Sequence, residues 1–195
     1  MRVFIAVLVL IFSLQSWTKA DDISDFEIEG ISIGDSLLDY FSEEEIKSFY
    51  PIKYPGSNKI YGYEIAENSL ATKSLKTFDT MGFHFKKDDK TYKIVNLKGI
   101  IQYPNNVEDC LKKKEEVVKE IRSILNNTEE ESYKGDYGTG SSVAYITDFK
   151  QKDGQIRVWC TDWDIKTETE KRWEDDLNVS VGTVDFLNWI NNEAY

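Results

Sequence analysis

Histidine and cysteine are scarce in this sequence, which removes much of the chemistry used by enzymes and metal sites. The 195 residues include one histidine, His84, and two cysteines. A Ser-His-Asp or Cys-His mechanism would have to use His84, yet no G-x-S-x-G segment accompanies it. Zinc sites need several histidine or cysteine ligands. The sequence therefore argues against these mechanisms and against a histidine-based zinc site, and it indicates no catalytic residue, no specific metal ligand and no cofactor.

Basic residues are also in the minority. There are 24 lysines and arginines against 35 aspartates and glutamates, a net charge of −11. The one basic run, Lys112 to Lys114, is followed at once by Glu115 and Glu116 and is typical of a solvated helix face. Nucleic acids and anionic membrane surfaces bind concentrated basic patches. We therefore expect neither kind of partner.

The first 20 residues have the pattern of a cleaved signal peptide. Arg2 precedes an apolar run over residues 3–14, and Thr18 with Ala20 matches the small-x-small rule for cleavage before Asp21. The run is shorter than the roughly 20 apolar residues that span a bilayer. An uncleaved signal anchor is the alternative. Cleavage leaves residues 21–195, with 22 basic and 35 acidic residues and a net charge of −13.

This length suits a single domain, which we expect to be periplasmic or secreted, without a stable membrane anchor. Cys110 and Cys160 are its only cysteines. Exported proteins meet an oxidising compartment, so we predict a disulfide between them. Two buried free thiols are the alternative. The disulfide would leave no free thiol for cysteine catalysis.

The strongest helix signal lies over residues 107–125. Its apolar residues recur with the 3.6-residue period of one helix face, and Asn105 with Glu108 can cap its start. A C-terminal helix is expected from Val184 to about Asn192, with Thr183 as N-cap. Near the N-terminus, short helical turns are expected after Asp35 as a cap and after a Ser42–Glu45 capping box.

Alternating apolar residues predict the strands and their hairpins. Expected strands cover residues 59–66, 81–87, 91–103, 143–149, 155–165 and 177–181, and residues 128–142 are expected to be a polar linker. In the first hairpin Met81, Phe83 and Phe85 share a face, as do Val95 and Leu97 with two later residues of that strand. His84 points to the opposite, more polar side, where we expect it to be exposed.

Together these segments predict an α+β fold: an antiparallel sheet with one long helix packed across a face and short terminal helices. Cys110 lies on the apolar stripe of the helix, and Cys160 shares strand parity with Ile156 and Val158. A disulfide would therefore dock the helix on that face of the sheet. The opposite face, with Arg157, Trp159, Thr161 and Trp163, must be covered by the terminal helices or be a binding surface.

Candidate ligand-binding residues lie at the end of this strand. Asp162, Trp163 and Asp164 place two carboxylates beside an aromatic ring, with Trp159 nearby. Such a group could serve glycoside hydrolysis or bind calcium, although no EF-hand pattern is present. A solvated strand end is the other interpretation. Trp159, Trp163, Trp173 and Trp189 could form an aromatic platform for sugar or a protein partner, or be core.

Two segments carry a resemblance. Residues 26–41 and the stretch Asn178 to Val181 followed by a Trp-bearing helix resemble the two ends of small exported proteins of marine bacteria, a likeness that implies no function. Ile33 to Ser36 is similar to a turn in small periplasmic modules of the β-lactamase-inhibitor-like type, which favours a non-enzymatic role.

We therefore expect an exported acidic domain that binds a protein or a small ligand without catalysis. The alternative is a carboxylate-based glycan hydrolase or a glycan-binding protein, and a third possibility is a calcium-stabilised structural domain.

Overall fold

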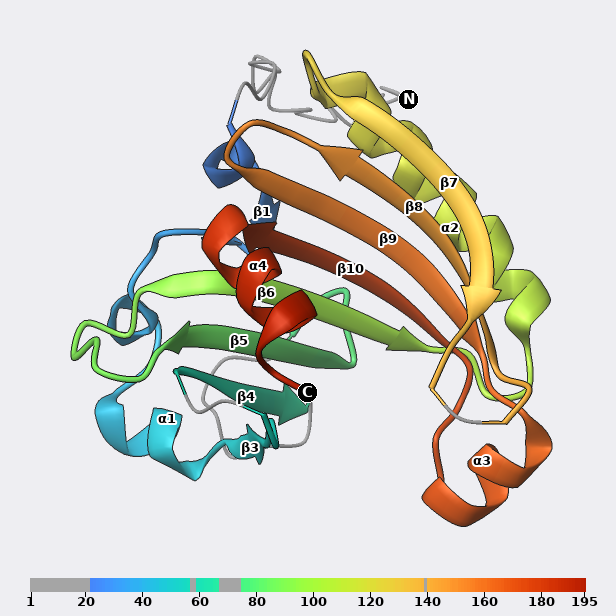
Figure 1. Ribbon diagram of the computed structural model, residues 1–195, viewed down its shortest axis with the longest axis horizontal. Helices are drawn as coiled ribbons and strands as arrows, with labels where there is room; N and C mark the ends of the chain where they lie inside the picture. The colour runs from blue at the N-terminus through green and yellow to red at the C-terminus, as the bar shows by residue number, and fades with distance from the viewer. Residues whose placement is uncertain (1–21, 57–58, 67–74, 139) are drawn as a thin grey trace, which may run out of the picture.

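The computed structural model describes residues 22–56, 59–66, 75–138 and 140–195, so the predicted signal peptide lies outside the described residues. An eight-stranded antiparallel sheet, in the order β3-β4-β5-β6-β10-β9-β8-β7, dominates the fold (Figure 1). Its strands are β3 (Tyr50–Ile52), β4 (Ile60–Ala66), β5 (Thr80–Lys86), β6 (Ile94–Gln102), β7 (Glu129–Asp136), β8 (Val143–Lys150), β9 (Gly154–Asp162) and β10 (Asp176–Thr183). A separate hairpin pairs β1 (Glu27–Ile28) with β2 (Ile31–Ser32).

Helices cover both faces of the sheet. The helices of the described residues are η1 (Ile23–Asp25), η2 (Leu37–Asp39), α1 (Glu43–Ser48), α2 (Val107–Ile124), α3 (Ile165–Lys171) and α4 (Val184–Asn192). The 18-residue α2 lies across β9 and β10 on one face, and α4 crosses β6 and β10 on the other (Figure 1). The predicted α+β architecture, with one long helix on an antiparallel sheet, is confirmed.

The main hydrophobic core lies between the sheet and α2. Apolar side chains of the N-terminal segment complete this core over β5 and β6, among them Ile31, Leu37 and Ile46. The described N-terminal and C-terminal segments therefore cover different faces: η1, η2 and α1 lie on the α2 face, and α4 lies on the other. A smaller cluster under α4 contains Phe186 and Trp189.

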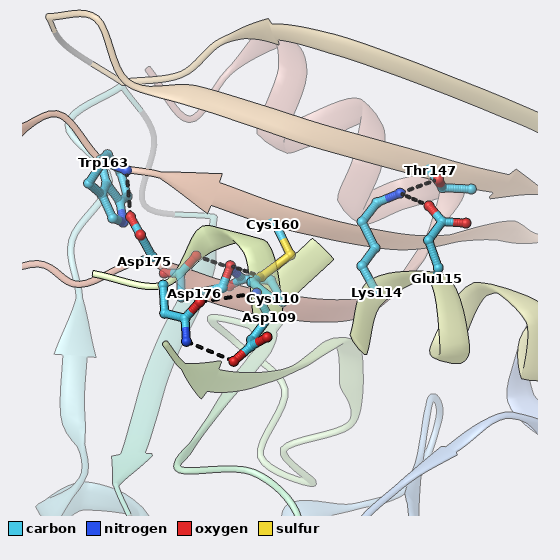
Figure 2. Close-up of a disulfide and its surroundings, with 11 residues drawn as sticks. Asp109, Cys110, Lys114, Glu115, Thr147, Cys160, Trp163, Asp175 and Asp176 are labelled. Atoms are coloured by element: carbon cyan, nitrogen blue, oxygen red, sulfur yellow. Dashed lines mark hydrogen bonds and ion pairs between the residues drawn. A yellow bond between two sulfur atoms is a disulfide. The ribbon is translucent and has the colours of Figure 1, made fainter. Parts of the chain in front are cut away.

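The disulfide between Cys110 and Cys160 is present and joins α2 to β9, with Cα atoms 6.1 Å apart (Figure 2). Both cysteines are fully buried in the main core. The helix begins at Val107 as expected, but its N-cap is Asn106 and not Asn105, because the Asn106 side chain accepts a hydrogen bond from the Asp109 N–H. Asn105 instead has a left-handed φ of 52°.

The last residue of the basic run, Lys114, is buried, contrary to our expectation of a solvated helix face. Its side chain lies against the sheet, only 5% of the residue is exposed, and its Nζ donates to Thr147 Oγ1 at 2.7 Å (Figure 2). The position falls on the buried face of α2 with Cys110 and Val118. Burial lowers the pKa of Lys114. A run of charged residues predicts exposure only on average. Here the helical period places Lys114 on the same face as Cys110 and Val118, and that position determines its burial.

The predicted linker over residues 128–142 is largely a strand instead. Edge strand β7 pairs along its whole length with β8, from Glu129 opposite Lys150 to Asp136 opposite Val143. Its side chains are almost all polar and exposed, so it lacks the apolar alternation by which we recognised the other strands. A charged edge strand resists pairing with another chain.

A β-bulge corrects the predicted face of Val95. In the β5–β6 pair Phe85 lies opposite Ile94 but His84 lies opposite Asn96, which leaves Val95 as the extra residue. Val95 therefore packs in the cluster under α4, while Leu97 lies in the main core. Strand parity assumed an unbroken ladder and could not anticipate the bulge.

The predicted caps differ in outcome. The Ser42–Glu45 capping box and the Thr183 N-cap are confirmed. Asp35 is not the N-cap of η2, because Ser36 fills that position while Asp35 accepts from the Ser32 N–H and the Tyr40 hydroxyl. No helix in the described part of the chain is both long and apolar enough to cross a membrane.

Candidate functional site

A pocket of about 310 Å³ lies on the α4 face of the sheet; we call it the sheet pocket. Strands β6, β10 and β9 form its floor, α4 forms one wall, and Tyr54, Tyr137 and Tyr195 line its sides. Its volume is at the lower end of the range typical of small-molecule sites. The sequence left open whether the terminal helices cover the face that carries Arg157 and Trp159. In the structure α4 covers this face only in part, and the sheet pocket lies beside it.

Small residues in the strand register create this hollow. Ser180 on β10 stands between Lys98 on β6 and Arg157 on β9, and Gly82 lies on the far side of Lys98. In the next row Gly182 lets α4 approach, since a Cβ there would stand 3.0 Å from Phe186. Long polar side chains thus flank the short side chain of Ser180.

The two cations of the floor are paired to different degrees. The Arg157 guanidinium donates to both carboxylate oxygens of Asp148, at 2.7 Å from Nε and 2.8 Å from Nη2. Lys98 Nζ lies 3.7 Å from Glu64, beyond ordinary hydrogen-bond length, and its side chain is partly exposed. Each partner carboxylate lies on the outer side of its cation, away from Ser180.

Asn96 organises the polar floor beside Ser180. Its Nδ2 donates to Ser180 Oγ at 2.8 Å and to the Val181 carbonyl oxygen at 2.8 Å. Because Ser180 accepts this bond, its own O–H remains able to donate toward the pocket. Gln155, two strands from Asn96 across Gly182, has a buried Nε2 with no hydrogen-bond partner among the described residues.

His84 lies in the wall of the pocket and is not exposed, so that prediction is wrong. Only 4% of it is accessible, because Phe186 of α4 and Tyr54 pack on its ring, and the Tyr54 hydroxyl lies 2.5 Å from Nε2. Burial, together with the charge of Lys98, lowers the pKa of His84 to about 3. The same burial raises the pKa of Tyr54. This pair is therefore neutral throughout the physiological range.

The structure separates the predicted ligand-binding residues into two places. Trp159 is buried in the floor of the sheet pocket. Asp162 is the last residue of β9, and Trp163 packs against Tyr137 and Trp173 beyond the end of that strand, with ring centroids 5.6 and 4.6 Å away. Trp173 is exposed, whereas Trp189 is buried under α4.

Asp164 belongs to a helix start and not to the strand, which ends at Asp162 and not at Ile165. As N-cap of α3 it accepts from the backbone N–H groups of Lys166 and Thr167, and Ser142 donates to its other oxygen at 2.7 Å. Hydrogen bonds from Ser142 and Thr167 lower the pKa of Asp164 to about 2. Asp162 and Asp164 are thus not a pair on one strand face.

Our sequence-based list missed Lys98, Asn96 and Ser180. The signal present was two polar residues, Asn96 and Lys98, alternating inside an otherwise apolar strand. That alternation indicates a strand with one polar face, but it does not say which residues of β9 and β10 stand beside them. Register supplies that information.

Comparisons add no relative to this picture. No family model, no curated protein and no solved structure matches the chain. Over the described residues, no group of three or more histidine, cysteine, aspartate or glutamate side chains is arranged to hold a metal ion. The site must therefore be interpreted from its own geometry.

Proposed function

We propose that this protein is a non-enzymatic, exported binding module that takes a small organic ligand in the sheet pocket. The observation that carries the proposal is the pocket itself, in which aromatic walls surround a floor of fixed polar groups. Pockets of this kind bind ligands through apolar contact and use a few polar groups to orient them. The Arg157–Asp148 pair holds one such group in place.

The chemistry of the wall supports binding over catalysis. A general base needs a pKa near the working pH, and the His84 pKa of about 3 is far below it. Its Nε2 is already engaged by the Tyr54 hydroxyl. Asp164, the one predicted carboxylate with a clear structural role, is occupied in capping α3.

Two features support export. The apolar N-terminal segment matches a signal peptide, and the Cys110–Cys160 disulfide suits an oxidising compartment. We propose a periplasmic or secreted location on these grounds.

Ligand-observed NMR with a fragment library tests the binding proposal. Ser180→Phe places a large ring on the floor between Lys98 and Arg157, and Ile190→Trp narrows the pocket from α4 as a second blocking variant. Ser123→Phe, on the exposed side of α2, is the matched control. We expect fragments to bind the wild type and the control and to lose binding to both blocked variants. Absence of any fragment binding, or equal binding to the blocked variants, would refute the proposal.

A second candidate function is glycan binding at the aromatic cluster beyond the end of β9. The observation in its favour is the aromatic cluster of Tyr137, Trp163 and Trp173, in which Trp173 is 47% exposed. Exposed aromatic rings stack on sugars and anchor partners. On a glycan array, we expect Trp173→Ala to lose binding and Tyr50→Ala, at an exposed aromatic on β3, to retain it. A wild-type protein that binds no glycan would eliminate this candidate.

A further inference from the structure

We propose that the ligand of the sheet pocket is a small aryl or alkyl monocarboxylate, whose carboxylate lies over Ser180 between Lys98 and Arg157 and whose apolar body packs on Trp159 and α4. This inference rests on the proposed binding function and specifies its ligand class. Four features of the pocket support it.

Three polar side chains of the floor have donors that remain available. Ser180 Oγ already accepts from Asn96, so it offers its own O–H. Lys98 meets one carboxylate only at 3.7 Å and has further N–H groups to donate. The buried Nε2 of Gln155 has no partner within the described residues. A ligand that satisfies these groups must bring acceptors, because a buried donor without a partner is costly.

Positive charge flanks the same point from both sides. Lys98 and Arg157 are separated by the single residue Ser180 in one row of the sheet, so their backbones are about 10 Å apart at the usual strand spacing. Asp148 occupies Nε and Nη2 of the guanidinium, which leaves the Nη1 donors of Arg157. The gap over Ser180 thus lies between two cationic side chains whose charged ends turn outward, toward Glu64 and Asp148, and a bound carboxylate would draw on them from this gap.

The surroundings favour one negative charge over several. Glu64 and Asp148 stand just beyond the two cations in the same row, and the whole chain has a net charge of −11. A phosphate ester or a polyanion would meet repulsion from both. A single carboxylate instead fits between the cations and can accept from several donors at once.

The remaining wall is apolar. Trp159 in the floor and Phe186, Leu187 and Ile190 of α4 line the pocket beside the polar row. At about 310 Å³ the space suits a small body, such as a single ring on a short chain. Burial of that body supplies affinity, and the carboxylate fixes its direction.

Isothermal titration calorimetry with matched ligand pairs tests the inference. The set contains aryl and alkyl carboxylates with their primary amides, among them 3-phenylpropionate and 3-phenylpropionamide. We expect the carboxylates to bind the wild type roughly tenfold more tightly than their amides, the effect of one charge-assisted hydrogen bond. Lys98→Met should remove this preference, while Lys152→Met, which removes an exposed cation in the β8–β9 turn, should retain it.

Ser180→Ala provides a milder variant in case Lys98→Met fails to fold. We expect it to weaken carboxylate binding roughly threefold through loss of a neutral donor, and to leave amide binding closer to the wild-type value. If no carboxylate in the set binds more tightly than its amide, or if Lys98→Met behaves like Lys152→Met, the inference is overturned. Neutral fragments that still lose binding to Ser180→Phe would then leave the proposed function standing.

Discussion

His84 and Lys114 are ionisable side chains buried on opposite faces of the sheet, and each is stabilised differently. His84, under α4, gives up its charge, and its pKa falls to about 3. Lys114, on the buried side of α2, donates a hydrogen bond from Nζ to Thr147 Oγ1. That hydroxyl oxygen lies 2.9 Å from Ser132 Oγ. Both side chains occupy positions where strand or helix geometry turns them inward, and neighbouring segments close over them.

The His84 pKa predicts a pH dependence of stability. Between the unfolded value of 6.5 and the folded value of about 3, the unfolded state binds more protons, so stability falls as pH decreases. We expect the free energy of unfolding to fall by about 2 kcal/mol from pH 7.5 to pH 5 because of this group. Urea denaturation of the wild type and of His84→Gln measures the difference in slope.

The His84→Gln comparison removes the contribution of the carboxylates, which both proteins share. Equal slopes for the two proteins between pH 7.5 and 5 would show that His84 titrates alike in the folded and unfolded states. An NMR titration of the histidine ring provides the independent check, and it should show no protonation of the folded protein above pH 5.

Lys114 and Thr147 make a second prediction at the residue scale. Thr147→Val removes the hydroxyl acceptor of the buried ammonium and leaves it only the 3.7 Å contact with Glu115, so it should lower the free energy of unfolding by about 2 kcal/mol. Lys114→Met removes the charge and keeps the volume, so it should stay within about 1 kcal/mol of the wild type. Chemical denaturation of both variants decides the matter. A larger loss for Lys114→Met than for Thr147→Val would contradict it.

At the element scale, α2 and β9 are held together by the disulfide and by the apolar stripe of the helix. Cys110 is fully buried between Asn106, the N-cap, and the core contacts of Val118 and Ile121. The crosslink therefore restrains a helix that already packs on the sheet, and it acts mainly on the unfolded chain.

Removing the disulfide should lower stability without changing the fold. Cys110→Ala with Cys160→Ala opens a loop with a sequence separation of 50 residues, which corresponds to a loss of about 4 kcal/mol in the chain-entropy description. Thermal and urea unfolding measure the loss, and far-UV circular dichroism should stay the same. A double variant as stable as the oxidised wild type would disprove the prediction.

At the scale of the whole molecule, the chain end closes the α4 face. The Gly56 N–H donates to the Ala194 carbonyl oxygen at 2.9 Å, and Tyr195 packs against Tyr54 in the pocket wall. Ala194 itself is fully buried. This contact ties the C-terminus to the segment between β3 and β4, and thereby completes the sheet pocket.

Gly56 is the residue on which this closure depends. A Cβ there would stand 2.4 Å from the Glu193 carbonyl oxygen and 2.9 Å from the Ala194 carbonyl carbon, both backbone atoms. We expect Gly56→Ala to lower the free energy of unfolding by about 2 kcal/mol, the effect of overpacking. Gly135→Ala, where an added Cβ meets nothing within 4 Å, is the control in the same denaturation experiment. Equal stabilities would contradict the docking of the chain end.

Local patterns in the sequence determined the helices and strands that can be recognised from neighbouring residues alone. Helical periodicity located α2, capping residues located the starts of α1 and α4, and alternation located six of the sheet's strands. The disulfide followed from composition and compartment, because only two cysteines were present to pair.

Tertiary structure alone decided which residues meet at the pocket. The positions of Lys98, Ser180 and Arg157 in one row depend on the register of three strands that are distant in sequence, and the burial of His84 depends on where α4 crosses them. The polar edge strand β7 and the β-bulge between β5 and β6 were likewise missed, because neither follows the alternation of apolar and polar residues that marks a regular strand. Period and composition are properties of neighbouring residues, whereas a site on a sheet face is made by pairing across strands.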